Sequence, residues 1–505
     1  MKAKKCVIIG SGLGGLSCGC ILAKNGYEVT VLEQGSQTGG CLQCFRRGNA
    51  LFDTGMHYIG SADEGQVLHT ILHYLGVNCD LQLSRLDPTG YDIIAFQGQH
   101  YPLANGREAF IDQLAERLPG CDEELQRYYD LTTMVASSSP MHGLNKHVDM
   151  NVFAEYQTKS TNEVINSVVK HPVLKEVLSG ILPLYAGEKD RTPFAIHALI
   201  FDFYNQSAFR IVGGSSIVAD SLVRSIRNMG GKVLTRHEVC KITCDETHAT
   251  TVFTTDGHCF PADIIISAIH PARTVQLIES KLLRPAYRKR IQALRNTTAA
   301  FTVYLKFRKD RVPYMNSNLY YYRGKSVWDW QQKNQKWPQW LLYMHFCHST
   351  VNRHPSTVTI PPQYAQTGEI LTYMDYDEVR QWEGTAIGHR GADYEDFKRS
   401  KAEAAIDALE EEVPGIRDCI EEYYTSTPLT YQNYTGIPEG SMYGVARDVE
   451  NLVSGTVNCR TSIPNLLLTG QSTACHGMLG VLAGSLVTCA ETIGMDTLLA
   501  QINNA

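Results

Sequence analysis

The chain has 505 residues, of which 43% are hydrophobic and 19% are charged, and this composition excludes a disordered or low-complexity protein. At roughly 150 residues per domain, the length suggests about three domain-sized units or one composite fold. The net charge of −6 provides no basic field for a nucleic acid, so no nucleic-acid partner is expected.

The N-terminal residues predict a strand–helix–strand unit. An apolar run over 6–9 predicts a strand, 16–25 predicts a helix, and 27–32 predicts a second strand. A G-x-G-x-x-G motif stands between the first strand and the helix. Its residues are Gly10, Ser11, Gly12, Leu13, Gly14 and Gly15.

Each part of this unit suits a dinucleotide. Gly10 permits a tight turn, Gly12 lets the backbone approach a pyrophosphate, and Gly15 lets helix and strand pack closely. The free N–H groups at the start of the helix attract phosphates. Glu33 follows the second strand, where an acid binds ribose hydroxyls and repels a 2′-phosphate. The sequence therefore predicts a dinucleotide site.

The glycine pair Gly39-Gly40 comes next. It resembles the extended fingerprint of FAD enzymes in the glutathione-reductase-like superfamily, where such a pair lies near the second phosphate and the ribityl chain. The resemblance implies FAD as the cofactor. It also implies contacts with FAD from Gln34, Gly39, Gly40, Cys41, Arg46, Thr54 and Gly55.

The middle of the chain predicts a further part of the same fold. Gly213-Gly214 precedes a predicted helix over 217–229. Strands are predicted over 230–234, 239–242, 251–255 and 262–268. In the FAD pattern, Val239 would contact the adenine through its backbone.

The C-terminal region shows a buried-strand pattern over 465–471 that ends in Thr-Gly, followed by a predicted helix over 482–492. FAD enzymes of the superfamily close the cofactor site with such a strand–glycine–helix element. The resemblance implies contacts with FAD from Gly470, Gln471, Gly480 and Val481.

The fold class predicted from these parts is α/β, with a Rossmann-like FAD-binding domain and an inserted α+β substrate domain. The FAD-binding domain is expected to consist of residues 1–80, 206–275 and 431–505. The segments 81–205 and 276–430 carry no dinucleotide motif and are assigned to the substrate domain. The first of them predicts a strand over 92–96 and helix from 108 to about 135.

Several motifs resemble the flavoprotein family of phytoene desaturases, carotene isomerases and retinol saturases, over nearly the full chain. The stretch Phe52–Gly60 is similar to a retinol saturase signature, and further similar stretches are 194–199, 427–430, 440–444 and 468–471. The resemblance implies an FAD-dependent oxidoreductase acting on carbon–carbon double bonds of a conjugated polyene or isoprenoid, such as a retinoid or carotenoid. Saturation, desaturation and isomerisation stay open, with hydride transfer at flavin N5.

Such chemistry needs a proton donor beside the flavin. His57 is the first candidate, because its motif follows the Gly39-Gly40 turn, and Tyr58, His197 and His476 are weaker candidates. The chain has no second G-x-G-x-x-G for a nicotinamide. We therefore expect an apolar small-molecule substrate and an external electron donor or acceptor, which is a nicotinamide, a quinone or a redox protein.

Fifteen cysteines, an odd number, are spread along the chain without a zinc-type spacing, so we expect reduced thiols and no metal site. Glycines interrupt the first apolar run too early for a signal peptide, and no run of about 18 apolar residues occurs that would span a membrane. These features predict a cytoplasmic protein and leave peripheral membrane contact open.

Two other functions compete with the polyene enzyme. Cys41 and Cys44 form a C-x-x-C directly after the glycine pair, which suggests a flavin-linked thiol–disulfide oxidoreductase. A non-catalytic protein with an FAD fold that binds an apolar ligand is the third hypothesis.

Overall fold

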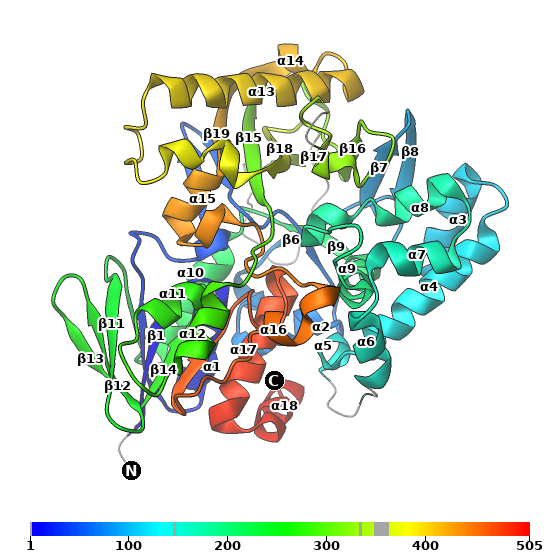
Figure 1. The fold of residues 1–505 in the computed structure, drawn as a ribbon. Helices are drawn as coiled ribbons and strands as arrows, with labels where there is room; N and C mark the ends of the chain where they lie inside the picture. The colour runs from blue at the N-terminus through cyan, green and yellow to red at the C-terminus, as the bar shows by residue number, and fades with distance from the viewer. Residues whose placement is uncertain (1–2, 145–147, 149, 333–335, 348–362) are drawn as a thin grey trace.

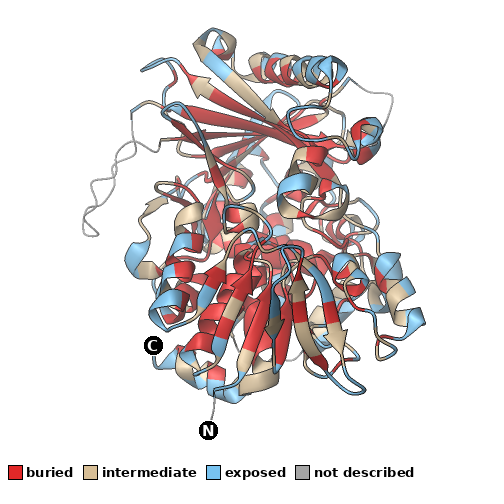
Figure 2. Cartoon of the chain, turned by 90° about the vertical axis from the view of Figure 1, so that its left-hand side faces the viewer, coloured by how far each residue is buried: buried red, intermediate tan, exposed pale blue. Residues whose placement is uncertain are grey.

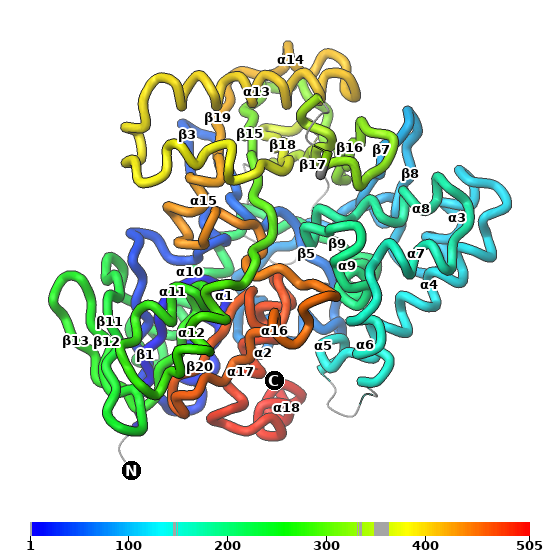
Figure 3. The backbone as a smooth tube through the Cα atoms, viewed as in Figure 1, coloured from blue at the N-terminus to red at the C-terminus, as the bar shows by residue number. Residues whose placement is uncertain are grey.

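A parallel sheet and a larger mixed sheet lie at opposite ends of the molecule, and a group of helices lies beside them (Figure 1). Both termini lie at the end that holds the parallel sheet (Figure 3). The computed structural model describes residues 3–144, 148, 150–332, 336–347 and 363–505.

The parallel sheet is assembled from three distant stretches of the chain. Its strands, in spatial order, are β10 (Lys232–Leu234), β2 (Glu28–Leu32), β1 (Lys5–Ile9), β14 (Ile264–Ser267) and β20 (Leu466–Leu468). Both faces are covered, since Cys6 and Ile8 belong to one hydrophobic cluster and Val7 and Ile9 to another. Burial on both faces explains why these strands read as continuous apolar runs, and the predicted strands are confirmed.

Three helices pack together on one side of this sheet: α1 (Leu13–Lys24), α10 (Ser216–Asn228) and α17 (Gly477–Ile493). Helix α1 begins three residues earlier than predicted, because Leu13, Gly14 and Gly15 of the glycine motif are already helical. Small residues let these helices approach. A Cβ atom at Gly19 would lie 3.0 Å from the Ile226 side chain, and one at Gly14 would lie 3.1 Å from the Gly470 Cα atom.

Smaller elements complete this end of the molecule. An antiparallel sheet contains β11 (Val239–Cys244), β12 (Ala249–Thr254) and β13 (Cys259–Pro261). The hairpin of β3 (Cys44–Arg47) and β4 (Ala50–Asp53) follows the first unit along the chain but packs against the mixed sheet, where Phe52 meets Tyr304 and Tyr424. Nearby helices are α2 (Val67–Leu75), α11 (Pro271–Gln276), α12 (Pro285–Gln292) and α18 (Met495–Asn503).

The mixed sheet joins strands from both segments that lack dinucleotide motifs. Its strands, in spatial order, are β19 (Ile420–Ser426), β15 (Ala299–Phe307), β18 (Thr367–Met374), β17 (Trp340–Phe346), β16 (Asn318–Tyr322), β7 (Asp92–Phe96) and β8 (Gln99–Leu103). Helix α13 (Ala392–Glu412) covers its outer face, and most residues of the central strands are buried (Figure 2).

Helices form the third part, on the right of Figure 1. They are α3 (Arg107–Arg117), α4 (Asp122–Ser137), α6 (Met150–Gln157), α7 (Thr161–Val168), α8 (Pro172–Ser179) and α9 (Phe194–Gln206). The helix predicted from 108 to 135 is wrong in one respect: it is two helices. The chain turns at Gly120, whose φ of +86° is costly for residues other than glycine.

A short three-stranded sheet ties this helical part to the rest. It contains β5 (Ile59–Gly60), β9 (Ala208–Ile211) and β6 (Leu83–Arg85). Within the described residues, no helix is both long and apolar enough to cross a membrane.

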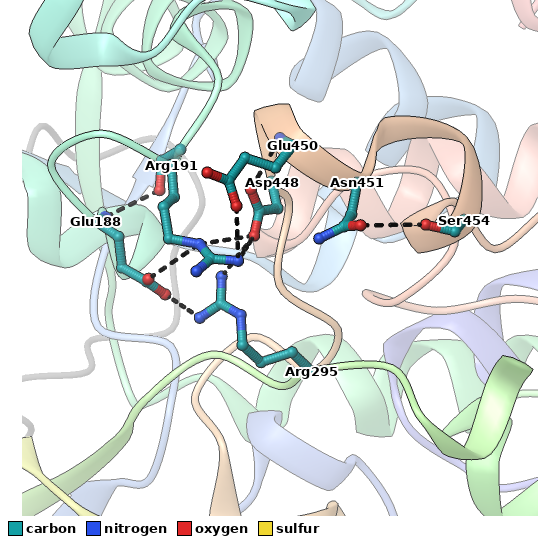
Figure 4. Close-up of polar contacts among 8 residues, drawn as sticks. Glu188, Arg191, Arg295, Asp448, Glu450, Asn451 and Ser454 are labelled. Atoms are coloured by element: carbon teal, nitrogen blue, oxygen red, sulfur yellow. Dashed lines mark hydrogen bonds and ion pairs between the residues drawn. The ribbon is translucent and has the colours of Figure 1, made fainter.

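A cluster of ion pairs also holds the segment before α9 against the 448–450 segment (Figure 4). Arg191 Nε donates to Asp448 Oδ2 over 2.7 Å, and Arg295 lies 3.3 Å from the same oxygen. Glu188 and Glu450 add further carboxylates around these two guanidinium groups. Both arginines are about 40% exposed, so we expect these ion pairs to add little to the free energy of unfolding. Their main role is to fix the position of the two segments relative to each other.

Candidate active site

A cavity of about 370 Å³ connects the glycine-rich loops of the parallel sheet with the inner face of the mixed sheet. Most of the residues predicted to contact FAD line it. They are Gly10, Gly12, Leu13, Gly14, Glu33, Gln34, Gly39, Gly40, Cys41, Thr54, Gly55, Val239, Gly470, Gln471 and Val481. The three distant stretches of the chain therefore meet at one site, as the motifs suggested.

The glycine loop has the geometry that a pyrophosphate needs. Gly10 has a φ of +93°, so the turn after β1 depends on glycine. A Cβ atom at Gly12 would meet no described atom within 4 Å, because this position opens into the cavity. Gly12 and Leu13 begin helix α1, whose first N–H groups and positive dipole end suit an anion.

Glu33 is held at the edge of the cavity by its neighbours. Its carboxylate accepts hydrogen bonds from the Ser11 N–H at 3.0 Å, the Ser11 hydroxyl at 2.6 Å and the Gly35 N–H at 2.8 Å. The side chain is therefore fixed where a ribose hydroxyl can be received. These features together fit a bound dinucleotide.

Two predicted cofactor residues act in packing, since they do not line the cavity. A Cβ atom at Gly15 would lie 2.0 Å from the Gly10 carbonyl oxygen, so glycine is required where α1 passes over β1. At Gly480, a Cβ atom would lie 2.7 Å from the Cys475 Cβ atom. Gly15 thus has the packing role that the motif predicts, whereas direct contact with FAD is not supported for Gly480.

Arg46 and His197 lie away from the cavity. Arg46 is exposed on strand β3, because the hairpin directs it to solvent. His197 is fully buried in α9, with Nε2 2.7 Å from the Tyr128 hydroxyl and Nδ1 3.0 Å from the Tyr185 hydroxyl. Burial lowers the pKa of His197 to about 3, so the ring is neutral. We remove both residues from the site.

His57 lines the cavity and is paired with a carboxylate that the motifs did not reveal. Its Nδ1 atom lies 3.0 Å from Glu369 Oε2, and the Glu369 side chain is completely buried. Glu369 belongs to β18, in which every residue is buried. A single acidic residue inside a buried apolar strand is the one sequence signal that could have identified it.

Each member of this pair changes the pKa of the other. Burial by itself lowers the pKa of His57, but the Glu369 charge outweighs it and the pKa is raised. Burial also raises the pKa of Glu369, and His57 only partly opposes this. The pair therefore retains a proton to higher pH than the isolated groups would. The contact is an ion pair by distance rather than a well-aligned hydrogen bond, because both His57 ring nitrogens and both Glu369 carboxylate oxygens are buried without a hydrogen-bond partner in the described part of the chain.

Tyr58 presents its ring to the cavity but uses its hydroxyl elsewhere. The hydroxyl donates to Asp92 Oδ2 over 2.9 Å and lies 2.6 Å from the Tyr320 hydroxyl. Burial, followed by the nearby Asp92 charge, raises the pKa of Tyr58 well above 10. Such a phenol is a weak acid, so His57 is the better proton donor of the motif.

The far end of the cavity is apolar. Its walls come from the helical part and from the mixed sheet, and include Pro183, Leu184, Ile200, Ala300, Leu342, Leu371 and Met442. Tyr204, Tyr431 and Tyr443 add aromatic rings to the same walls. An apolar wall with few polar groups indicates an apolar ligand.

The C-x-x-C pair does not have the environment of a redox pair. Burial raises the pKa of Cys41 to about 11, and burial together with the Asp53 charge raises that of Cys44 to about 12. The Cys44 thiol donates to Asp53 Oδ1 over 3.2 Å, and Cys44 does not line the cavity. Both surroundings disfavour the thiolate that disulfide chemistry requires.

Comparisons with known proteins agree with this geometry. A family model described as flavin-containing amine oxidoreductase matches residues 13–486. The chain is 29% identical to all-trans-retinol 13,14-reductase of Homo sapiens, covering 99% of this chain and 87% of that protein. It is 23% identical to prolycopene isomerase 1 of an Oncidium hybrid cultivar (97% and 84% covered), and 23% identical to the neurosporene-forming phytoene desaturase of Cereibacter sphaeroides (93% and 91%).

Among solved structures, an oxidoreductase from Methanosarcina mazei is similar, with a TM-score of 0.65 and 17% identity. The match covers 96% of this chain and 99% of that one. At this identity the likeness concerns the fold alone, and it confirms the predicted α/β fold class.

Proposed function

Because this chain belongs to the family of flavin-containing amine oxidoreductases, we propose that it is an FAD-dependent enzyme that acts on carbon–carbon double bonds of a conjugated polyene or isoprenoid. The named relatives, a retinol reductase, a prolycopene isomerase and a phytoene desaturase, support this substrate class. The observation that carries the proposal is the cavity itself, which runs from the glycine loops to an apolar chamber and includes His57 in its wall.

The dinucleotide end of the cavity would hold FAD. Gly12 and the start of α1 would receive the pyrophosphate, Glu33 a ribose and Val239 the adenine, and the support is that these residues line the cavity. Bound FAD supplies hydride transfer to or from carbon. The apolar walls orient the substrate and exclude water from the reacting carbons.

His57 moves the proton that accompanies this chemistry. Because Glu369 lies on the Nδ1 side of the ring, we assign the exchange of a proton with the substrate to Nε2. Glu369 is a positioning residue, since its carboxylate lies 3.0 Å from Nδ1 and raises the pKa of the ring. For saturation the Nε2 proton goes to carbon, and for desaturation it returns from carbon.

Replacing Glu369 with glutamine should move the pH profile of the reaction. Without the carboxylate, burial dominates and the pKa of His57 falls. For saturation, the rate is lost as pH rises through that pKa, so the basic limb of kcat/KM against pH should shift to lower pH. Glu411→Gln is the matched control, because its side chain is 43% exposed on α13.

The same pair affects stability. Both pKa values are raised in the folded protein, so the folded state binds more protons than the unfolded chain. The pair's contribution to the free energy of unfolding is complete below the pKa values of the unfolded chain. It is lost as the pH rises through the higher pKa values of the folded protein. Denaturant unfolding at several pH values should show the free energy of unfolding falling as pH rises, and Glu369→Gln should make this fall smaller.

For the kinetic prediction, an unchanged pH profile of kcat/KM in Glu369→Gln would show that Glu369 takes no part in the mechanism.

We also propose an external electron donor or acceptor, either a nicotinamide, a quinone or a redox protein. The support is the single G-x-G-x-x-G of the chain, which FAD occupies in this proposal. A cytoplasmic location and peripheral contact with a membrane stay predictions.

The proposed function is tested by anaerobic reduction of the flavin followed by a panel of retinoids, carotenoids and other conjugated isoprenoids. We expect one class to lose polyene absorbance while the flavin is reoxidised. The double variant Cys41→Ser, Cys44→Ser should keep this reaction. If no polyene reacts and the wild type reduces a disulfide that the double variant cannot, the thiol–disulfide alternative is correct. Polyene binding without any flavin redox change would favour the non-catalytic binder.

A further inference from the structure

Three potential metal ligands meet beside the small antiparallel sheet. His237 precedes β11, and Asp256 and His258 lie in the turn between β12 and β13. One ligand atom from each residue lies within 4.8 Å of the other two. The His258 Nδ1 atom is 3.2 Å from Asp256 Oδ2, and the His237 Nε2 atom is 3.7 Å from the same oxygen.

Hydrogen bonds within the cluster turn one His237 ring nitrogen and one Asp256 carboxylate oxygen toward the other ligand atoms. The His237 Nδ1 atom lies 2.8 Å from the Thr235 carbonyl oxygen, so Nδ1 donates this hydrogen bond and Nε2 is the nitrogen turned toward Asp256. The Thr254 hydroxyl donates to Asp256 Oδ1 over 2.5 Å, so the other carboxylate oxygen, Oδ2, is the one that faces the two histidines.

We propose that His237, Asp256 and His258 form a binding site for a divalent transition metal ion such as Zn²⁺. Two imidazole nitrogens and one carboxylate oxygen are a ligand set that zinc accepts, with water in the fourth position. The backbone carbonyl behind His237 is the second-shell partner that metal-binding histidines usually have.

An ordinary surface ion pair explains this arrangement less fully than a metal site does. One protonated histidine would satisfy Asp256, yet two rings flank it, with centroids 5.4 Å apart. Two imidazole nitrogens directed at one carboxylate oxygen are placed to share a single cation with it. The ligand atoms need to approach by a few tenths of an ångström up to about 1.5 Å to reach zinc-bound spacing. The exposed turn that carries His258 can accommodate this movement.

The site is distinct from the proposed catalytic pair but adjoins the cofactor cavity. His237 lines that cavity next to Glu238 and Val239, at the end where the adenine is expected. The sequence predicted no metal site, because His237 stands far from the Asp256-x-His258 turn along the chain. Only the pairing of β11 with β12 brings them together.

The experiment is a titration of the full-length protein with Zn²⁺ near pH 7.5, followed by calorimetry. Exposed thiols would also bind zinc, so Cys79, Cys240 and Cys259 are first alkylated in every sample. We expect one Zn²⁺ per wild-type chain. His258→Ala and Asp256→Asn should each weaken binding by about tenfold or more, as expected for a lost ligand.

His248→Ala is the matched control, since His248 is an exposed histidine on the turn between β11 and β12 and lies outside the cluster. It should bind Zn²⁺ as the wild type does. Far-UV circular dichroism checks that the variants are folded, which is expected because the His258 side chain is 63% exposed. Absence of zinc binding in the wild type, or equal binding in His258→Ala and the wild type, would overturn the proposal.

Discussion

The variant His57→Gln is expected to convert a polyene about 10²- to 10⁴-fold more slowly than the wild type, which is the usual contribution of a positioned proton donor. Glutamine keeps much of the size of the ring but cannot deliver a proton at Nε2. The measurement is single-turnover reoxidation of the reduced flavin by the substrate identified in the panel. Because His57 lies in the cavity wall rather than in the glycine loops, the variant should still contain FAD, as its visible absorbance would show.

Tyr58→Phe is the comparison within the same motif. Its hydroxyl is bonded to Asp92 and Tyr320, which do not line the cavity, so its removal should slow turnover far less than His57→Gln does. Stability should fall instead, because Asp92 loses a buried hydrogen-bond donor. Equal losses of rate in the two variants would contradict the assignment of the proton to His57.

Two alanine substitutions in the glycine motif should fail in different ways. Gly12→Ala should fold normally and bind FAD about 10- to 100-fold more weakly, because its Cβ atom points into the cavity and meets no described protein atom within 4 Å. The backbone at Gly12 has a φ of −65°, which alanine adopts without strain. The cost therefore falls on the cofactor alone.

Gly15→Ala should instead destabilise the protein before any cofactor is considered. Its Cβ atom would lie 2.0 Å from the Gly10 carbonyl oxygen, so α1 has to shift away from β1, at a cost of about 3 kcal/mol or more. Thermal unfolding of the FAD-free proteins separates the two outcomes, and fluorescence titration with FAD measures affinity. Loss of apo stability in Gly12→Ala, or normal stability in Gly15→Ala, would contradict this division of roles.

The two pairs of variants test different halves of the proposal. The glycine variants concern whether FAD sits in the glycine loops, and the His57 variants concern what happens at the apolar end. If Gly12→Ala weakens FAD binding but His57→Gln leaves turnover unchanged, the glycine loops remain the proposed cofactor site. Another residue must then donate the proton.

The dinucleotide end of the site was predictable because its signals are local. A strand, a glycine turn, a helix and an acid lie within the first 33 residues, and each is dictated by backbone conformation or close packing. The resemblance to FAD enzymes added Gly39, Gly40, Val239 and Gly470, all of which line the cavity. Turns that require glycine can be recognised in the sequence, since few other residues adopt a positive φ.

The two site predictions that the structure does not support concern residues whose burial and side-chain direction cannot be read from the sequence. Arg46 stands near the right loop in the sequence but on the exposed side of a hairpin, and His197 points into tyrosines of the helical core. Sequence position gives neither the face of a strand nor the partner of a buried ring. A charged residue near a motif is therefore weak evidence for a contact.

Motifs in the sequence were enough to recognise the family, and the strand–turn–helix pattern predicted the α/β class and the glycine loops that line the cavity, because particular residues enforce such short-range conformation. Tertiary structure alone decided that Glu369 lies against His57, that the helices and the mixed sheet enclose an apolar chamber, and that His237 meets His258. Each of these depends on side chains from distant strands converging in a low-dielectric interior or at a sheet edge. Such convergence is set by the packing of the whole chain and has no local pattern that could announce it.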